Sequence, residues 1–130
     1  MKKEEKQLLI KDLCARLPYK VKGMAETTDG NGKEIKDEGV LNSVFINEYG
    51  KAYICIEGME YELDGFKPYL RPMSSMTEEE NEYRKELIKD IKHGANIDKL
   101  EDFYHSRNLD YHGLIEKGLA LEAPEDMYEI

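Results

Sequence analysis

The sequence predicts an α+β protein: an N-terminal helix, a small antiparallel β-barrel or bent sheet of the SH3-like kind, and a C-terminal helical tail packed on it. Three observations predict this fold class. Residues 19–66 hold short apolar and β-branched runs separated by glycine turns, which is typical of strands. From residue 77 onward, apolar residues recur every three or four positions among Glu and Lys, which is typical of helices. Between the two patterns lie Pro68 and Pro72, which neither donate to a β-ladder nor continue a helix.

The change of pattern also predicts how the chain is organised. We expect residues 1–73 to form the first helix and the barrel, and residues 74–130 to form the helical tail, in one compact unit. A chain of 130 residues fits a single domain. A chain of this size buries roughly two-thirds of the surface that it exposes when unfolded. It therefore needs neither a metal nor a disulfide bond to fold.

The first predicted helix covers residues 3–17. Its apolar residues recur at helical spacing and form a stripe wide enough to face a core. Pro18 ends the helix, because the residue before a proline is pushed away from helical angles. The residues of the stripe are Leu9, Ile10, Leu13, Cys14 and Leu17.

Four or five short strands follow at intervals of about ten residues, which favours a small antiparallel barrel or a strongly bent sheet. The DGNG run at residues 29–32 predicts a hairpin turn, since these residues tolerate positive φ angles. Asp64 and Gly65 predict a bulge or bend. The predicted strands are residues 19–26, 40–46, 52–57 and 60–66.

The tail begins with a predicted helix at residues 77–93. Thr77 and Glu80 form a capping-box pattern at its start, and Gly94 is a suitable C-cap. Asn96 is a suitable N-cap for a second helix. The apolar face of that second helix consists of Ile97, Leu100, Phe103 and Tyr104.

A third, short helix is predicted around Leu114 and Ile115, ending near Gly118, and residues 119–124 are expected to be extended. Met127, Tyr128 and Ile130 are unusually apolar for a disordered terminus. We therefore expect at least part of the tail to dock on the rest of the chain.

The formal net charge of −9 at pH 7 disfavours general nucleic-acid binding, because affinity for a duplex depends on Lys and Arg that neutralise phosphates. The charge is distributed unevenly. Residues 1–23 carry seven basic and three acidic side chains, residues 24–66 three and ten, and residues 93–130 three and nine. A basic first helix on an acidic body leaves two interpretations open: a solvated helix face, which is more common, and a contact with an anionic partner.

The N-terminal segment has basic residues but only a three-residue apolar run before Lys11, which fits neither a signal peptide nor a membrane span. The two cysteines, Cys14 and Cys55, lack an export signal and are expected to be reduced. We expect a cytoplasmic protein with no membrane partner.

Three histidines invite a metal or acid–base interpretation: His93, His105 and His112. His105 and His112 are seven positions apart, outside the spacing of familiar zinc sites. Asp110 stands two residues before His112 and is a candidate to orient its ring, although proximity in sequence is weak evidence for a pair. Histidines that pack helices or lie on the surface are the favoured interpretation.

The remaining motifs do not indicate catalysis. Cys14 and Cys55 lie in apolar patterns, where buried structural thiols are the usual role. Asp29 and Asn31 resemble the start of a calcium loop, but Lys33 occupies the next ligand position. The chain also has no phosphate-binding glycine motif. We therefore expect a protein that is not an enzyme and has no cofactor or metal site.

Two groups of residues form a candidate interaction surface. The first is a basic and aromatic patch at residues 66–71, expected to be exposed, which suits stacking with bases or peptide side chains. The alternative is that its aromatic rings close the end of the barrel. The second is the acidic face of the last predicted strand, for which protection of a sheet edge is the alternative. The candidate residues are Phe66, Lys67, Tyr69 and Arg71 in the first group and Glu60, Glu62 and Asp64 in the second.

Two segments are distinctive enough to compare with known families: PYLRPMSSMTEEE at residues 68–80 and DYHGLIEKGLALEAPEDMY at residues 110–128. With LIKDLCARLPY at residues 9–19, they are similar to a group of small uncharacterised proteins of gut Bacteroidetes and their phages and prophages. The chain departs from that group at His112, where Arg is usual, and at Asp126, where Gly is usual. The resemblance implies an origin in a phage or mobile element and names no chemistry.

The absence of a catalytic constellation, together with exposed aromatic and acidic residues, favours a non-enzymatic module that binds a protein partner. The alternative is a small-barrel protein associated with nucleic acid through the basic first helix and the patch from Phe66 to Arg71. A third possibility, an acidic mimic of DNA, requires denser carboxylates than a net charge of −9 over 130 residues supplies.

Overall fold

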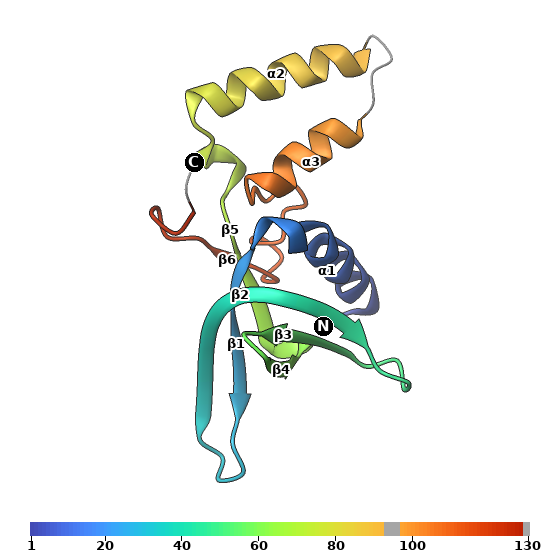
Figure 1. Cartoon of the computed structure of the whole chain (residues 1–130), viewed down its shortest axis with the longest axis vertical. Helices are drawn as coiled ribbons and strands as arrows, with labels where there is room; N and C mark the ends of the chain where they lie inside the picture. The colour runs from blue at the N-terminus through green and yellow to red at the C-terminus, as the bar shows by residue number, and fades with distance from the viewer. Residues whose placement is uncertain (93–96, 129–130) are drawn as a thin grey trace.

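The computed structural model describes residues 1–92 and 97–128. The fold is α+β, as predicted, with an N-terminal helix, a six-stranded sheet and further helices. Figure 1 shows α1 beside the sheet, and α2 and α3 together at one end of the molecule. The helices are α1 (Lys3–Arg16), α2 (Glu78–Lys92) and α3 (Asp98–Ser106), and three short 3-10 turns cover Leu17–Tyr19, Leu63–Gly65 and Met73–Ser75. The strands are β1 (Lys22–Thr28), β2 (Glu34–Ile46), β3 (Ala52–Ile56), β4 (Met59–Glu62), β5 (Phe66–Leu70) and β6 (Leu121–Glu122).

Helix α1 confirms the predicted first helix. Leu9 and Leu13 are fully buried, but the same side of the helix also buries Asp12 and Arg16. Cys14 is exposed, so its expected burial is wrong. The buried stripe follows positions 9, 12, 13 and 16, and Cys14 lies outside it.

The sheet order is β4-β3-β2-β1-β5-β6, antiparallel except for the β5–β6 pair. Strand β2 connects two halves, because its first part pairs with β1 and its last part with β3. The register shifts between Leu41 and Ser43, a bulge that bends the strand, and the Asn42 side chain there accepts the N–H of Glu57 at 2.6 Å. The sheet remains open, with β4 and β6 as its edges, and so a closed SH3-like barrel is not confirmed.

The DGNG run forms the predicted hairpin turn between β1 and β2. The Asp29 carboxylate accepts the N–H groups of Asn31 at 2.8 Å and Lys33 at 2.9 Å. Gly32 has a φ of +80°, which glycine adopts without steric cost. The turn sits at the tip of the arm that points away from the helices in Figure 1.

The predicted strand at residues 60–66 is in fact two strands. A 3-10 turn at Leu63–Gly65 separates β4 from β5, and β5 continues through Pro68. Strand β5 lies inside the sheet, between β1 and β6. Pro68 lies opposite Gly23 of β1, and β6 pairs with β5 only at Tyr69 and Leu70, so the β5–β6 pair needs no N–H from Pro68.

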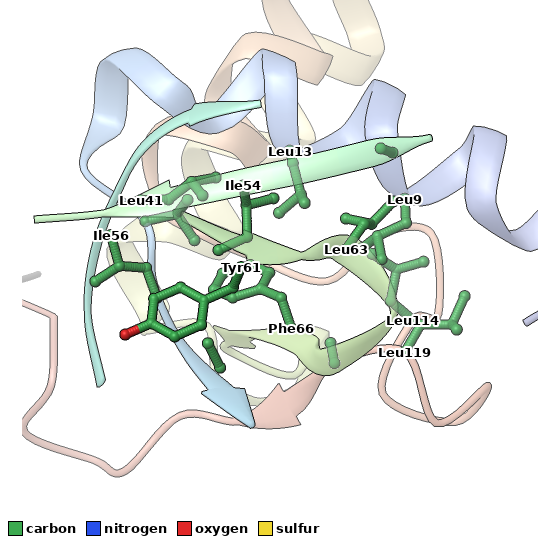
Figure 2. Packing of buried hydrophobic residues seen from close by; sticks show 14 of the residues in the cluster. Leu9, Leu13, Leu41, Ile54, Ile56, Tyr61, Leu63, Phe66, Leu114 and Leu119 are labelled. Carbon is green, nitrogen blue, oxygen red and sulfur yellow. The ribbon is translucent and has the colours of Figure 1, made fainter. Parts of the chain in front are cut away.

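One core joins the sheet, α1 and the C-terminal segment. Figure 2 shows side chains from α1, the strands and the tail pointing into the same space. From the tail, Leu114 is fully buried, and Leu119 and Ala120 are also buried. The labelled members of this cluster are Leu9, Leu13, Leu41, Ile54, Ile56, Tyr61, Leu63, Phe66, Leu114 and Leu119.

Helix α2 begins as predicted. Thr77 Oγ1 accepts the N–H of Glu80 at 3.1 Å, and Glu80 Oε1 accepts the N–H of Thr77 at 2.9 Å, which completes the capping box. The predicted caps Gly94 and Asn96, and also His93, lie outside the described residues.

The third predicted helix is absent from the described tail, where residues 114–118 form hydrogen-bonded turns instead. Gly113 and Gly118 take φ angles of +71° and +74°, which interrupt a helix on both sides. The predicted extended segment is partly strand β6. Docking of the terminus is visible at Tyr128, whose hydroxyl donates to the Tyr69 carbonyl at 2.7 Å and accepts the N–H of Lys22 at 2.9 Å.

Candidate functional site

In the structure, the residues of the predicted basic and aromatic patch at 66–71 do not form a common exposed surface. Phe66 is 1% exposed and belongs to the core, and Tyr69 is also buried. Arg71 is 6% exposed, whereas Lys67 is exposed. The expectation that this patch is exposed is therefore wrong, because β5 lies between two other strands and is covered by α1 and the tail.

The buried aromatic and basic side chains of this patch have structural partners. The Tyr69 hydroxyl donates to Glu38 Oε1 at 2.6 Å, and burial together with this hydrogen bond raises the pKa of Tyr69 to about 12. Arg71 donates to both carboxylate oxygens of Glu80, at 2.9 and 2.7 Å, and to the Ser75 carbonyl at 3.0 Å. Arg71 thus fastens the end of β5 to the start of α2.

The Arg71–Glu80 pair sets the charge state of Glu80. Burial alone would raise the pKa of Glu80, but the hydrogen bonds from Arg71 and from the Thr77 N–H outweigh it and hold the pKa below its ordinary value. The Glu80 carboxylate is consequently charged at neutral pH, and both of its oxygens accept hydrogen bonds.

A second buried polar cluster links α1 to the segment after α3. Arg16 donates to Asp12 at 2.7 and 3.1 Å and to the Leu109 carbonyl at 2.6 Å. The Nδ1 atom of His112 lies 3.0 Å from Asp12 Oδ1. Sequence reasoning missed this cluster, although two opposite charges four residues apart within an apolar stripe were a visible signal.

The histidines do not form the predicted pair with Asp110. The Asp110 carboxylate instead accepts the N–H groups of Leu114 at 2.8 Å and Ile115 at 2.9 Å. His105 Nε2 lies 2.8 Å from the Tyr111 hydroxyl, and burial, followed by the nearby Arg16 charge, lowers the pKa of His105. His112 therefore joins the tail to α1 through Asp12, and His105 packs within the tail against Tyr111; both have structural contacts of the kind that the favoured interpretation expects.

The acidic residues of the last predicted strand are exposed, as expected. Glu60 and Glu62 belong to β4, and Asp64 lies in the turn that follows. Asp64 Oδ1 is 3.9 Å from Lys6 Nζ. Because β4 ends the sheet, these side chains line an edge strand.

The sheet register brings aromatic side chains beside these carboxylates. Glu62 lies opposite Tyr53, and Tyr53 lies opposite Phe45, so all three occupy one face. Two residues along the strands, Glu60 lies opposite Cys55 on the same face. We call Phe45, Tyr53, Glu60 and Glu62 the outer-sheet surface.

The aromatic pair of the outer-sheet surface is ordered and accessible. The rings of Phe45 and Tyr53 stack with centroids 5.5 Å apart and planes 17° apart. Phe45 is 36% exposed. Lys51 Nζ lies 5.8 Å from the Tyr53 ring and 2.7 Å from Glu62 Oε1, and it bridges the aromatic and acidic parts of the surface.

The turn between β2 and β3 carries two exposed residues at the end of the sheet, of which Ile46 lies on the core-facing side of β2 because it pairs with the buried Ala52. The Asn47 side chain accepts the N–H groups of Tyr49 at 3.0 Å and Lys51 at 2.9 Å, which fixes the turn. Tyr49 is 86% exposed and Ile46 is also exposed. Sequence reasoning assigned these residues to a turn and a strand and did not identify them as a surface.

Comparison of the chain with protein-family models, with curated proteins and with solved structures finds no match. Among the described residues, no helix has the length and the apolar character needed to cross a lipid bilayer.

Proposed function

We propose that the protein is a non-enzymatic interaction module that binds a protein partner through the outer-sheet surface. The observation that carries this proposal is the stacked pair of Phe45 and Tyr53 on a solvent-facing side of the sheet. Aromatic rings are enriched at protein interfaces because each contributes a large contact area and loses little conformational freedom on binding.

The position of the rings supports the same function. Helix α1 and the tail cover the opposite face of the sheet, where Ile54 and Ile56 belong to the core. A partner that buries the outer-sheet surface removes apolar area from water, the main favourable term in association.

The charges around the rings indicate the chemistry of the partner. Glu60 and Glu62 flank the aromatic pair, and because Glu62 and Lys51 balance each other, Glu60 contributes the net negative charge beside the rings. An apolar group flanked by Lys or Arg side chains fits this arrangement, because complementary charges favour the correct register.

Three further expectations are part of this proposal. The long bent strand β2, shared between two halves of the sheet, supports an SH3-like description of the fold. The origin in a phage or mobile element rests on the resemblance of the terminal and joint segments. A cytoplasmic location is consistent with Cys14 and Cys55, which are both free thiols.

The nucleic-acid alternative retains the exposed Lys3 and Lys11 of the first helix but only Lys67 as an exposed cation of the patch from Phe66 to Arg71. Phe66 and Arg71 are buried, and Arg16 of the first helix is buried and paired with Asp12. We retain nucleic acid only as an outcome of the test below.

The test is affinity capture of tagged protein from a lysate of the cell that makes it, with and without nuclease. We compare the unmodified protein with a Phe45→Ser/Tyr53→Ser variant and with Ile97→Ser, which alters an exposed apolar residue outside the outer-sheet surface. A protein retained by the unmodified chain and by Ile97→Ser, but lost from the double variant, supports the proposal. If the double variant retains every protein that the unmodified chain retains, or if the proteins captured depend on nuclease-sensitive material, the proposal is contradicted. Circular dichroism verifies that each variant is folded.

A further inference from the structure

Helix α2 presents a second surface, on a different element from the outer-sheet surface. It packs mainly on α3, through a small cluster that includes Leu87, Phe103 and Tyr104. Figure 1 shows the two helices side by side at the edge of the molecule, with α2 outermost. Much of the α2 surface therefore faces solvent.

Tyr83 lies at the centre of a groove between these two helices. Its side chain is 51% exposed, and its ring meets Phe103 edge to face with centroids 5.2 Å apart. Three adjoining hollows share Tyr83 as a lining residue, with volumes of about 650, 460 and 270 Å³. We call this feature the Tyr83 groove; its main lining residues are Glu78, Glu79, Glu82, Tyr83, Glu86 and Phe103.

The Tyr83 groove is strongly acidic along α2. Glu78, Glu82, Glu86 and Asp90 are spaced four residues apart, so they form one row of like charges. Such pairs repel and destabilise a helix. The helix dipole explains acidic residues only in the first turn, and Glu82 and Glu86 lie beyond it. The dipole accounts for Glu78 and the ion pair with Lys85 for Glu82, whereas neither accounts for Glu86 and Asp90.

The basic residues beside the groove neutralise it only in part. Lys85 Nζ lies 3.5 Å from Glu82 Oε1, an exposed ion pair that is worth little. Arg107 Nε lies 3.8 Å from the inward-facing carboxylate of Glu80, so part of its charge is already balanced. Lys99 lines the smallest of the hollows. Four exposed glutamates of α2 therefore outnumber these three cations.

We propose that the Tyr83 groove binds a lysine- and arginine-rich segment of a protein partner. A basic side chain lies over the face of the Tyr83 ring, where the π-electrons attract a cation. Its neighbours on the segment pair with the glutamates of the row, and their aliphatic stems cover the Tyr83 and Phe103 rings. Nucleic acid does not fit this groove, because its phosphates meet carboxylates. The inference is independent of the outer-sheet surface.

The probe is a fluorescein-labelled 12-residue peptide of arginine, lysine and leucine, with a counterpart in which glutamate replaces the basic residues. Binding is measured by fluorescence anisotropy at physiological salt. We expect the basic peptide to bind and its counterpart not to bind. Tyr83→Ala and Glu78→Gln/Glu82→Gln/Glu86→Gln are each expected to weaken binding at least tenfold, and Tyr83→Phe to retain it.

The matched control separates a groove from a general effect of net charge. Glu60→Gln/Glu62→Gln/Asp64→Asn removes the same three charges at the sheet edge and should change the affinity less than twofold. An equal loss in this control, or no binding of the basic peptide, overturns the proposal. Amide shifts in a ¹⁵N-labelled sample provide an independent readout: peptide-induced changes must centre on Tyr83 and Phe103, and changes centred on Tyr53 overturn the assignment.

Discussion

At the scale of single residues, two buried arginines hold distant segments together. Arg16 connects α1 to the Leu109 carbonyl, and Arg71 connects the end of β5 to Glu80 of α2. Both pairs have additional hydrogen bonds, which a buried charge needs if its desolvation is to be offset. The Arg71 guanidinium is engaged by Glu80 and backbone carbonyls, although the sequence alone made Arg71 a candidate to bind a ligand, whereas the buried Nη1 atom of Arg16 has no hydrogen-bond partner.

The Arg71–Glu80 pair predicts a specific dependence of stability on pH. Because the folded state holds the pKa of Glu80 below its ordinary value of 4.5, the unfolded chain binds more protons when the pH falls below that value. The stabilisation is complete above about pH 4.5 and is lost as the pH falls through the folded pKa. Glu80→Gln, which leaves Arg71 buried without a counter-charge, should lower stability at pH 7 by about 3 kcal/mol.

Urea denaturation at several pH values measures this effect. Glu80→Gln should also flatten the fall in stability between pH 6 and pH 3. The exposed neighbour Glu79 provides the control, since Glu79→Gln should reproduce the pH profile of the unmodified protein. If Glu80→Gln keeps the full stability at pH 7, the pair does not stabilise the fold.

At the scale of elements, local signals predicted the helices and turns but not the centre of the sheet. The apolar spacing of α1 and the capping box of α2 involve residues within one or two turns, and both predictions are confirmed. Strand β5 pairs with β1 and with β6, which lie more than forty residues away in the sequence on either side. No pattern within a few residues predicts pairing between segments so far apart in the sequence. Pro68 also disfavours a strand at this position, because it cannot donate to a ladder.

The same distinction explains the candidate surfaces. Glu60 and Glu62 were recognised because apolar and acidic residues alternate within one strand, which predicts that the acidic side chains face solvent. Phe66, Tyr69 and Arg71 were misjudged because their burial depends on α1, β6 and α2. Phe45 and Tyr53 were missed because only the register between β2 and β3 places their rings together.

Because β1 and β5 approach each other closely at Gly23, a methyl group added there should destabilise the fold. A Cβ atom at Gly23 would lie 2.2 Å from Cζ and 2.4 Å from Cε1 of the buried Phe66 ring. Gly23→Ala must therefore displace Phe66, and overpacking of this kind costs about 1–3 kcal/mol. Gly30→Ala, with no atom within 4 Å, is the matched control. The midpoint of urea denaturation should fall for the first variant alone, and Phe66→Leu should relieve part of the loss; equal midpoints would refute the packing.

At the scale of the whole molecule, the residues that form the core and the residues of the two proposed binding surfaces lie on different sides of the sheet and of α2. The core unites α1, the sheet and residues near Leu114 and Leu119, so the outer side of the sheet and the far side of α2 remain available. The two surfaces lie on different elements and differ in composition. Two such surfaces let one small chain hold two partners at once, which is consistent with the proposed role as an interaction module.

The shared core also decides whether the first part of the chain can fold without the tail. A chain that ends after Ser75 loses Leu109, Leu114 and Leu119, which are buried against Arg16 and the sheet. We expect this truncated chain to aggregate and to show no cooperative thermal transition, because a large apolar area of α1 and the sheet becomes exposed. In the intact chain, Leu114→Ala should cost about 2–5 kcal/mol through loss of burial and creation of a cavity, whereas Ile97→Ala, at an exposed position, should cost little. Calorimetry and light scattering distinguish the outcomes: a soluble, cooperatively folding chain of residues 1–75 would show that the tail is an independent arm and that residues 1–73 are a domain by themselves.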